Sequence, residues 1–191
     1  MTARTTRRTA RPHAPASGRA SSTRKAAASQ AQAATASALP TTPRRLALCI
    51  QHDPAAGPLP VSRQQLRRWV QAALTHDAEL VLRFVDRDES QALNHQYRGK
   101  NRPTNVLTFE YASQPVVQAD IVICLPVLTD EATAQQKSLR NHLAHLVIHG
   151  VLHAHGMDHL NDEEAAEMEG REITLLKRFR IADPYAPIAD D

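Results

Sequence analysis

The spacing of apolar and polar residues after position 45 predicts an alternation of short strands and amphipathic helices. Short apolar runs, some with period-two alternation, predict strands over residues 45–51, 79–85, 106–111 and 119–124. Helical spacing, capping residues such as Ser62 and Asp162, and the stop signal at Gly99 predict helices over residues 62–74, 89–98, 129–136, 139–155 and 162–178. The length of 191 residues suits one domain of ordinary size, provided that part of the chain is unstructured.

The helix predicted over residues 139–155 is apolar on several sides, through Leu143, Leu146, Val147, Ile148, Val151 and Leu152. A helix that is apolar nearly all round is normally surrounded by the rest of the protein. We therefore expect this helix to be central and buried.

The end of the same helix carries three histidines at spacings that suit one metal ion. His149 and His153 are four residues apart, so their imidazoles lie on one face, about 6 Å apart along the axis. Gly156 can adopt the left-handed conformation that ends a helix, which would return His159 toward the same point. Three imidazoles and a water are the arrangement expected of a catalytic zinc site. The sequence therefore predicts one zinc ion held by these three histidines, although imidazoles also suit nickel, copper or iron.

Other histidines lie close by in the sequence. We expect His142 and His145 to support the site or to pack beside it, because no glycine turn and third imidazole follow them at the corresponding distance. His155 points off the stripe and is not expected to bind the metal. The alternative for the three predicted ligands is that they are ordinary hydrogen-bonded histidines.

Gly150 stands where zinc proteases of the metzincin class carry a glutamate general base. The absence of that carboxylate disfavours peptide hydrolysis by the usual route. A zinc peptidase or another metallohydrolase therefore remains only as an alternative function. Asp158 is expected to orient an imidazole. Four glutamates further on are interpreted as a solvated helix face and not as the missing base: Glu163, Glu164, Glu167 and Glu169.

Charge is distributed unevenly along the chain. Residues 1–45 contain nine Lys or Arg, no Asp or Glu, and mostly Ala, Ser, Thr and Pro. Such a composition buries too little apolar surface to offset chain entropy, so we expect a disordered basic extension. Three roles remain open for this extension: contact with nucleic-acid phosphates, simple solubilisation, or organellar targeting. The rest of the chain has 14 Lys or Arg against 20 Asp or Glu and is therefore acidic.

Two features bear on the compartment. Cys49 and Cys124 lie in apolar, strand-like runs, which favours two buried free thiols and a reducing environment. No apolar run reaches the roughly 20 residues needed to span a bilayer. We therefore expect a cytoplasmic protein without a membrane segment.

Several segments together resemble the bacterial YbeY family in their order and spacing. They are Asn94–Phe109 (NHQYRGKNRPTNVLTF), Asp120–Cys124 (DIVIC), His149–His159 (HGVLHAHGMDH) and the acidic run Asp162–Glu164. The similarity covers roughly residues 46–185, which we take as a YbeY-like metallohydrolase domain, followed by a short tail over 186–191. Ala119 departs from the glycine usual in the family, which puts in doubt only the turn before the strand at Asp120.

The resemblance implies an α+β fold in which a small mixed sheet of four strands packs against about five helices, with the metal-binding helix at the centre. It implies a zinc-dependent endoribonuclease that cuts single-stranded RNA in 16S rRNA 3′-end maturation and ribosome quality control. Ribosomal RNA and the small ribosomal subunit would be its partners. A non-catalytic assembly factor that binds pre-rRNA is the alternative.

The resemblance also assigns roles to four residues. His149, His153 and His159 match the zinc ligands of the family, and Arg98 matches its functionally important arginine. A guanidinium presents paired donors that suit a phosphodiester and can stabilise the charge of a phosphoryl transition state. Without the resemblance, Arg98 would be an ordinary residue at a helix end.

Overall fold

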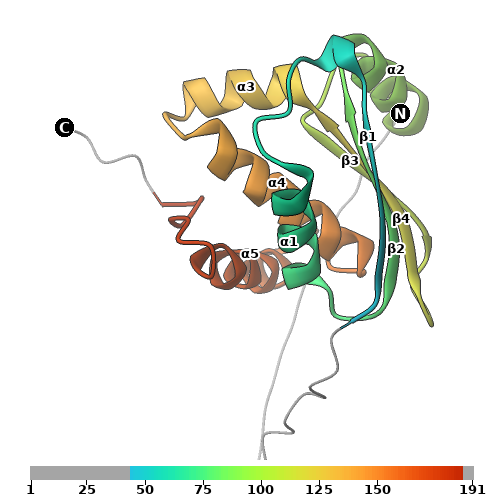
Figure 1. The fold of residues 1–191 in the computed structure, drawn as a ribbon, viewed down its shortest axis with the longest axis vertical. Coiled ribbons are helices and arrows are strands. Elements are labelled where there is room, and N and C mark those ends of the chain that lie inside the picture. Colours follow the sequence, from blue (N-terminus) through green and yellow to red (C-terminus); the bar gives the residue numbers. More distant parts are fainter. Residues whose placement is uncertain (1–43, 187–191) are drawn as a thin grey trace, which may run out of the picture. The chain divides into compact units, whose positions relative to one another are not determined.

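A four-stranded mixed sheet forms one layer of residues 44–186, the part of the chain that the computed structural model describes (Figure 1). The strands are β1 (Leu46–His52), β2 (Ala78–Val85), β3 (Val106–Ala112) and β4 (Val117–Cys124), in the spatial order β1-β2-β4-β3. β1, β2 and β4 are parallel, whereas β3 pairs antiparallel with β4 at one edge.

Five α-helices and a short 3₁₀ segment connect and follow the strands in the described residues. They are η1 (Pro54–Ala56), α1 (Arg63–Ala73), α2 (Arg87–Arg98), α3 (Leu125–Ala134), α4 (Leu139–Ala154) and α5 (Asp162–Lys177). The predicted α+β fold, with a mixed sheet of four strands and five helices, is confirmed.

Local sequence signals explain where most helices begin and end. A polar side chain accepts a hydrogen bond from the backbone N–H three residues further on at Ser62, Asp86, Ser138 and Asn161. Asn161, and not the predicted Asp162, therefore caps α5. Gly99 ends α2 with a φ of 68°, as the sequence predicted. α3 begins at Leu125, earlier than predicted, because Pro126 fits the first turn of a helix, where its missing N–H needs no partner.

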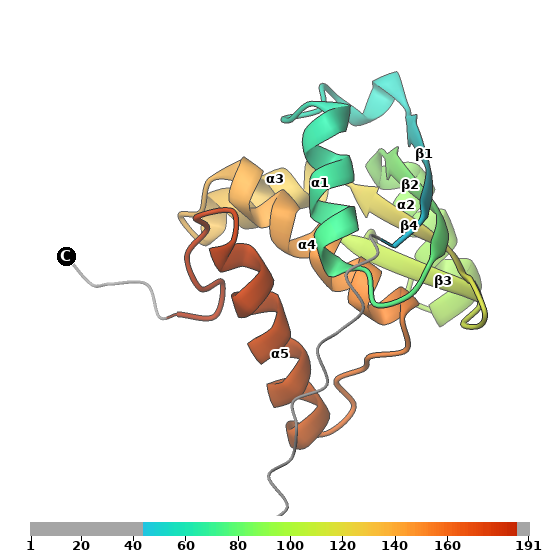
Figure 2. The same cartoon turned by 60° about the horizontal axis from the view of Figure 1, so that its bottom comes forward.

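α4 is the central helix, and most of its residues are buried. It packs against α1, α3 and α5 and against strands β3 and β4. Figures 1 and 2 show α1, α3, α4 and α5 on one side of the sheet and α2 on the other. The expectation of a central, buried helix is confirmed.

The two faces of the sheet are covered unequally. One face contributes buried residues such as Leu82 and Ile121 to the main core, whereas α2 covers only part of the other face, where Leu93 packs near Val122. Cys49 points to the outer face of β1 and is exposed, so the prediction of two buried cysteines is wrong for this residue. Cys124 is buried, and burial raises the pKa of its thiol. Both cysteines are free.

The start of β4 differs from the prediction. The strand begins at Val117, and Ala119 lies inside it, 2% exposed and paired with Leu80 of β2. The departure from the family pattern at Ala119 therefore falls within the sheet and not in a turn. The predicted extension over 1–45 and the tail over 186–191 lie outside the described residues, except for positions 44, 45 and 186. No helix within residues 44–186 is long and apolar enough to cross a bilayer.

Candidate active site

A cleft of about 890 Å³ opens where the C-terminal end of α4 meets β3 and the segment after α2. The residues lining it include Arg98, Lys100, Thr104, Asn105, Thr108, Glu110, His149, His153, Asp158 and His159. The structure thus brings all four predicted site residues, from two separate helices and a loop, to one cavity.

The three predicted metal ligands lie close enough to share an ion. One ring nitrogen from each of His149, His153 and His159 lies within 4.8 Å of the other two. The ring centroids of His149 and His153 are 4.5 Å apart, and that of His159 lies 5.1 Å from His153 and 5.7 Å from His149. Gly156 follows α4 with a φ of 81°, a left-handed conformation that favours glycine, and the chain turns there so that His159 returns to the helix. This group is a candidate metal site.

The surroundings of His153 keep its imidazole neutral. Burial lowers its pKa, and the neighbouring rings of His149 and His159 lower it further, to about 4. A neutral imidazole has a free lone pair for a metal ion. At neutral pH, His153 therefore does not need to lose a proton before it can bind a metal ion.

Glu172 of α5 is fully buried beside His149. Its Oε1 lies 2.8 Å from His149 Nδ1, and its Oε2 lies 2.8 Å from His145 Nε2 and accepts a hydrogen bond from the Tyr185 hydroxyl. Burial would raise the pKa of this carboxyl group, but the hydrogen bonds from the histidines and Tyr185 outweigh burial and lower the pKa to about 2. An ionised carboxylate only accepts hydrogen bonds, so His149 carries its proton on Nδ1 and has Nε2 available for a metal ion.

The other histidines of this segment are His142, His145 and His155, and none of them lines the cleft. His145 bonds to Glu172 and so supports His149 from behind, whereas His142 Nε2 lies 2.8 Å from the carboxylate of Glu131 in α3. His155 Nδ1 hydrogen-bonds to the Val151 carbonyl, and its ring does not line the cleft. His145, His149 and Glu172 form a second group of potential ligands within 4.8 Å, but this group shares His149 with the first.

Sequence reasoning missed Glu172 and Tyr185. Glu172 lies on the same side of α5 as the buried Met168, Leu175 and Leu176. A glutamate at an apolar position of a helix was the signal that could have identified it. Tyr185 is an exposed residue in the irregular segment after α5, where no periodicity relates it to the site.

Gly150 brings α4 directly against the sheet. A Cβ at this position would lie 2.7 Å from Cγ2 of Ile121 in β4 and 3.4 Å from Oγ1 of Thr108 in β3. A side chain would therefore force the helix away from the sheet. The position next to His149 cannot hold a general base, which supports the interpretation that the site is not that of a metzincin protease.

Arg98 approaches the cleft from α2, where it is the last helical residue and is exposed. Lys100 lines the same cleft. Within residues 44–186, neither side chain forms an ion pair or a hydrogen bond with the protein. Both positive charges are therefore available to an anionic ligand.

The acidic residues around the histidines have different places. Oδ1 of Asp158 accepts a 2.8 Å hydrogen bond from the backbone N–H of His159 but lies 4.0 Å from His153 Nδ1. Asp158 therefore orders the loop. The expected hydrogen bond between Asp158 and an imidazole of the site is not present in the structure. None of the four glutamates interpreted as a solvated helix face lines the cleft. Glu163, Glu164 and Glu167 are exposed, and Glu169 is half-buried.

Comparison with known proteins bears on the same site. Residues 57–180 match the family described as Endoribonuclease YbeY. The chain belongs to the YbeY family. The Endoribonuclease YbeY of Cupriavidus metallidurans is 48% identical over 161 residues, which cover 82% of this chain and 81% of that protein. The Endoribonuclease YbeY of Thiobacillus denitrificans is 51% identical over 142 residues, which cover 73% of this chain and 96% of that protein.

A solution structure of a Thermotoga maritima protein is also similar, with a TM-score of 0.47 and 23% identity over 73% of this chain and 99% of that one. The resemblance to YbeY proteins predicted from separate sequence segments is confirmed by the family match and by the relatives. Membership of the YbeY family supports an endoribonuclease, a nuclease whose substrate is RNA.

Proposed function

We propose that the chain is a zinc-dependent, single-strand-specific endoribonuclease that acts in 16S rRNA 3′-end maturation and ribosome quality control. The observation that carries this proposal is the convergence of three imidazoles and Arg98 on one cleft in a member of an endoribonuclease family. In this proposal, the domain over residues 46–185 performs the cleavage in the cytoplasm, with ribosomal RNA and the small ribosomal subunit as partners.

The donor set of His149, His153 and His159 fits a single zinc ion. Three neutral imidazole ligands are typical of catalytic zinc sites, which leave one coordination position to water or substrate. Glu172 fixes the orientation and the tautomer of His149 from behind. When bound, such an ion supplies Lewis-acid chemistry toward a phosphodiester.

Arg98 is proposed to hold the scissile phosphodiester. Its planar donors match two phosphate oxygens, and its charge stabilises the extra negative charge of the phosphoryl transition state. Lys100 lines the same cleft and adds to the positive potential there. Within residues 44–186 neither residue forms an ion pair, so a phosphate does not compete there with an internal ion pair.

The attacking group is either water or the ribose 2′-hydroxyl. Gly150 leaves no room for a protein base beside His149, so the products must distinguish the two routes. A 2′,3′-cyclic phosphate end would exclude direct attack by water. Cleavage at a linkage with a 2′-deoxyribose would exclude the 2′-hydroxyl route.

The test combines metal analysis with digestion of a single-stranded RNA by the wild-type protein and by His153→Ala. We expect about one zinc ion per wild-type chain, and loss of both the metal and the cleavage in the variant. His155→Ala is the matched control, because His155 lies at the end of the same helix but does not line the cleft. Wild-type protein that binds no metal, or His153→Ala protein that still cleaves, would disprove the metal dependence.

The place of action is tested in cells that lack the protein. We expect 16S rRNA precursors with extended 3′ ends to accumulate, and the wild-type chain but not His153→Ala to restore normal ends. Normal 16S rRNA ends in the depleted cells would disprove this part of the proposal.

A further inference from the structure

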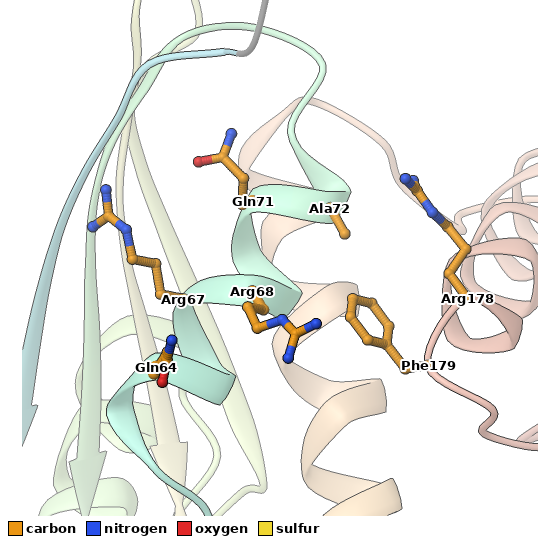
Figure 3. A pocket seen from close by; sticks show the side chains of 7 residues that line it. All are labelled: Gln64, Arg67, Arg68, Gln71, Ala72, Arg178 and Phe179. Atoms are coloured by element: carbon orange, nitrogen blue, oxygen red, sulfur yellow. The ribbon is translucent and has the colours of Figure 1, made fainter.

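A second cavity, of about 580 Å³, lies between α1 and the end of α5, outside the active site (Figure 3). Arg67 and Arg68 of α1 and Arg178, which follows α5, line it together with two glutamines, Ala72 and Phe179. It shares no lining residue with the active-site cleft. We call this cavity the arginine groove.

The positive charge of the arginine groove is not neutralised by the described part of the protein. No carboxylate lines it, and α1, with the sequence RQQLRRWVQAA, contains no acidic residue. Within residues 44–186, no ion pair involves Arg67, Arg68 or Arg178. This concentration of charge is unusual here, because the chain after residue 45 has 14 Lys or Arg against 20 Asp or Glu.

Backbone contacts orient one wall of the groove. A guanidinium nitrogen of Arg67 donates to the carbonyl of Leu46 at 3.0 Å, and the Gln71 amide donates to the carbonyl of Arg44 at 2.9 Å. A guanidinium held by a neutral carbonyl keeps its full charge and its remaining N–H donors. Figure 3 shows Arg67 turned toward the sheet and Arg68 directed toward Phe179, so the positive charge extends across both sides of α1.

The position of the groove determines how long a ligand must be to reach both sites. α4 packs against α1 on one side and against β3 on the other, so it separates the arginine groove from the cleft. We expect a short oligonucleotide that fills the cleft to contact the cleft alone. A longer RNA has a continuous supply of phosphates with which to reach both.

We propose that the arginine groove binds the sugar–phosphate backbone of RNA at a distance from the cleaved linkage. Guanidinium groups bind phosphate oxygens in pairs, and such contacts position an RNA without reading its sequence. This inference rests on RNA being the substrate, and it adds a second contact surface to the active site. The groove favours long RNA over short fragments, because only long RNA engages both surfaces.

The test measures binding of labelled single-stranded RNAs of about six and about 30 nucleotides to the full, metal-loaded chain. Fluorescence anisotropy is recorded at several salt concentrations, and a gel confirms after each titration that the RNA is intact. The variant is Arg68→Glu/Arg178→Glu, because neither side chain makes a hydrogen bond within residues 44–186. Thermal melting shows whether the variant is folded, and Arg68→Gln/Arg178→Gln replaces it if it is not.

The double variant is expected to bind the long RNA at least about tenfold more weakly at low salt. The slope of log affinity against log salt should fall by about 1.4, because each phosphate contact to a single strand contributes about 0.7. Binding and cleavage of the short RNA should not change. Wild-type affinity and slope for the long RNA in the folded variant would overturn the proposal.

Arg171→Glu is the control for Arg178→Glu, because Arg171 is an exposed arginine of α5 that does not line the groove. Equal losses in these two single variants would show a general charge effect and overturn the proposal. An acidic protein is the competing partner: if the two groove arginines control binding of a polyglutamate peptide but not of RNA, the proposal is also wrong. A wild-type protein that fails to cleave RNA would disprove the proposed nuclease, while the comparison of salt slopes would still decide the role of the groove.

Discussion

Glu172 occupies a position on the apolar side of α5, where its carboxylate is removed from water and held by His145, His149 and Tyr185. An isolated buried carboxylate is strongly unfavourable, so these hydrogen bonds are what keep it ionised. Its partner His149 is one of the proposed metal ligands. Glu172 therefore connects His145, which lies behind the site, to His149, whose other ring nitrogen is available to the proposed metal ion.

Replacement of Glu172 by glutamine is expected to weaken metal binding about 10- to 100-fold, a typical effect of removing a carboxylate that orients a histidine ligand. The amide has nearly the same shape, but it no longer fixes the proton on Nδ1 of His149. Zinc affinity is measured by competition with a chromogenic chelator. Glu169→Gln is the control, because Glu169 lies on the same helix and bonds to no histidine within the described residues. Equal zinc affinities of Glu172→Gln and wild type would contradict this role.

The pKa of His153 predicts how the stability of the metal-free protein depends on pH. Its value is about 4 in the folded protein, against an ordinary value of 6.5, so the folded state binds fewer protons than the unfolded state between these limits. This contribution to stability is present above about pH 6.5 and is lost as the pH falls toward 4. Glu172, with a pKa of about 2 against an ordinary 4.5, loses its contribution at still lower pH.

Urea unfolding of the apoprotein at several pH values between about 7.5 and 4.5 measures this effect. The free energy of unfolding should fall more steeply with acid for wild type than for His153→Ala. The difference between the two proteins isolates His153 from His142 and His155, whose pKa values burial also lowers. Parallel pH profiles would show that His153 titrates normally in the folded state.

At the scale of the element, the contact between α4 and the sheet depends on the missing side chain of Gly150. Ile121 and Thr108 fill the space that a Cβ would need. Gly150→Ala is expected to destabilise the protein by about 1–3 kcal/mol, because an added methyl group in a packed core forces the backbone to move. Since His149 is the preceding residue, the same shift should weaken zinc binding.

The control is Gly170→Ala on α5, where an added Cβ meets no atom within 4 Å. Alanine is the better helix former, so this variant should be more stable by about 0.5–1 kcal/mol. Urea denaturation of both variants gives the comparison. Equal stability of Gly150→Ala and wild type would mean that α4 does not approach the sheet as closely as the structure shows.

Elements with strong local signals could be predicted from the sequence, and those governed by tertiary contacts could not. The imidazole spacing and Gly156 predicted the group formed by His149, His153 and His159, because one helix and one turn determine it. The start of α3 at Leu125 was predicted too late in the sequence, although Pro126 is compatible with the first turn of a helix. The exposure of Cys49 could not be predicted, because it depends on which face of the sheet the helices leave uncovered. Glu172 comes to His149 only through the packing of α5 on α4, which no local pattern of residues 162–178 specifies.

At the scale of the whole molecule, the candidate active site lies where α2, β3 and α4 meet. Arg98 comes from α2 on one side of the sheet, whereas His149 and His153 come from α4 on the other, and His159 from the loop after α4. We therefore expect a substitution at Arg98 to leave the three proposed metal ligands in place. Because Arg98 and the histidines lie on different elements, a substitution at Arg98 can distinguish a proposed catalytic use of the metal from a purely structural one.

Arg98→Glu is expected to remain folded and to bind zinc, while its cleavage of RNA falls by about 10²–10³-fold, as when a donor that stabilises transition-state charge is removed. Arg98→Lys should retain part of the activity, because it keeps the charge and loses the paired geometry. Zinc content and cleavage rate are measured on the same preparations. Full rRNA processing by folded Arg98→Glu would favour a non-catalytic assembly factor.

α4 serves at once as the centre of the hydrophobic core and as the platform for two of the three imidazoles. We therefore expect any change that loosens the core also to separate the proposed metal ligands. A copy of the protein that loses its structure should therefore lose the proposed nuclease activity at the same time, so that no partly folded form cuts cellular RNA.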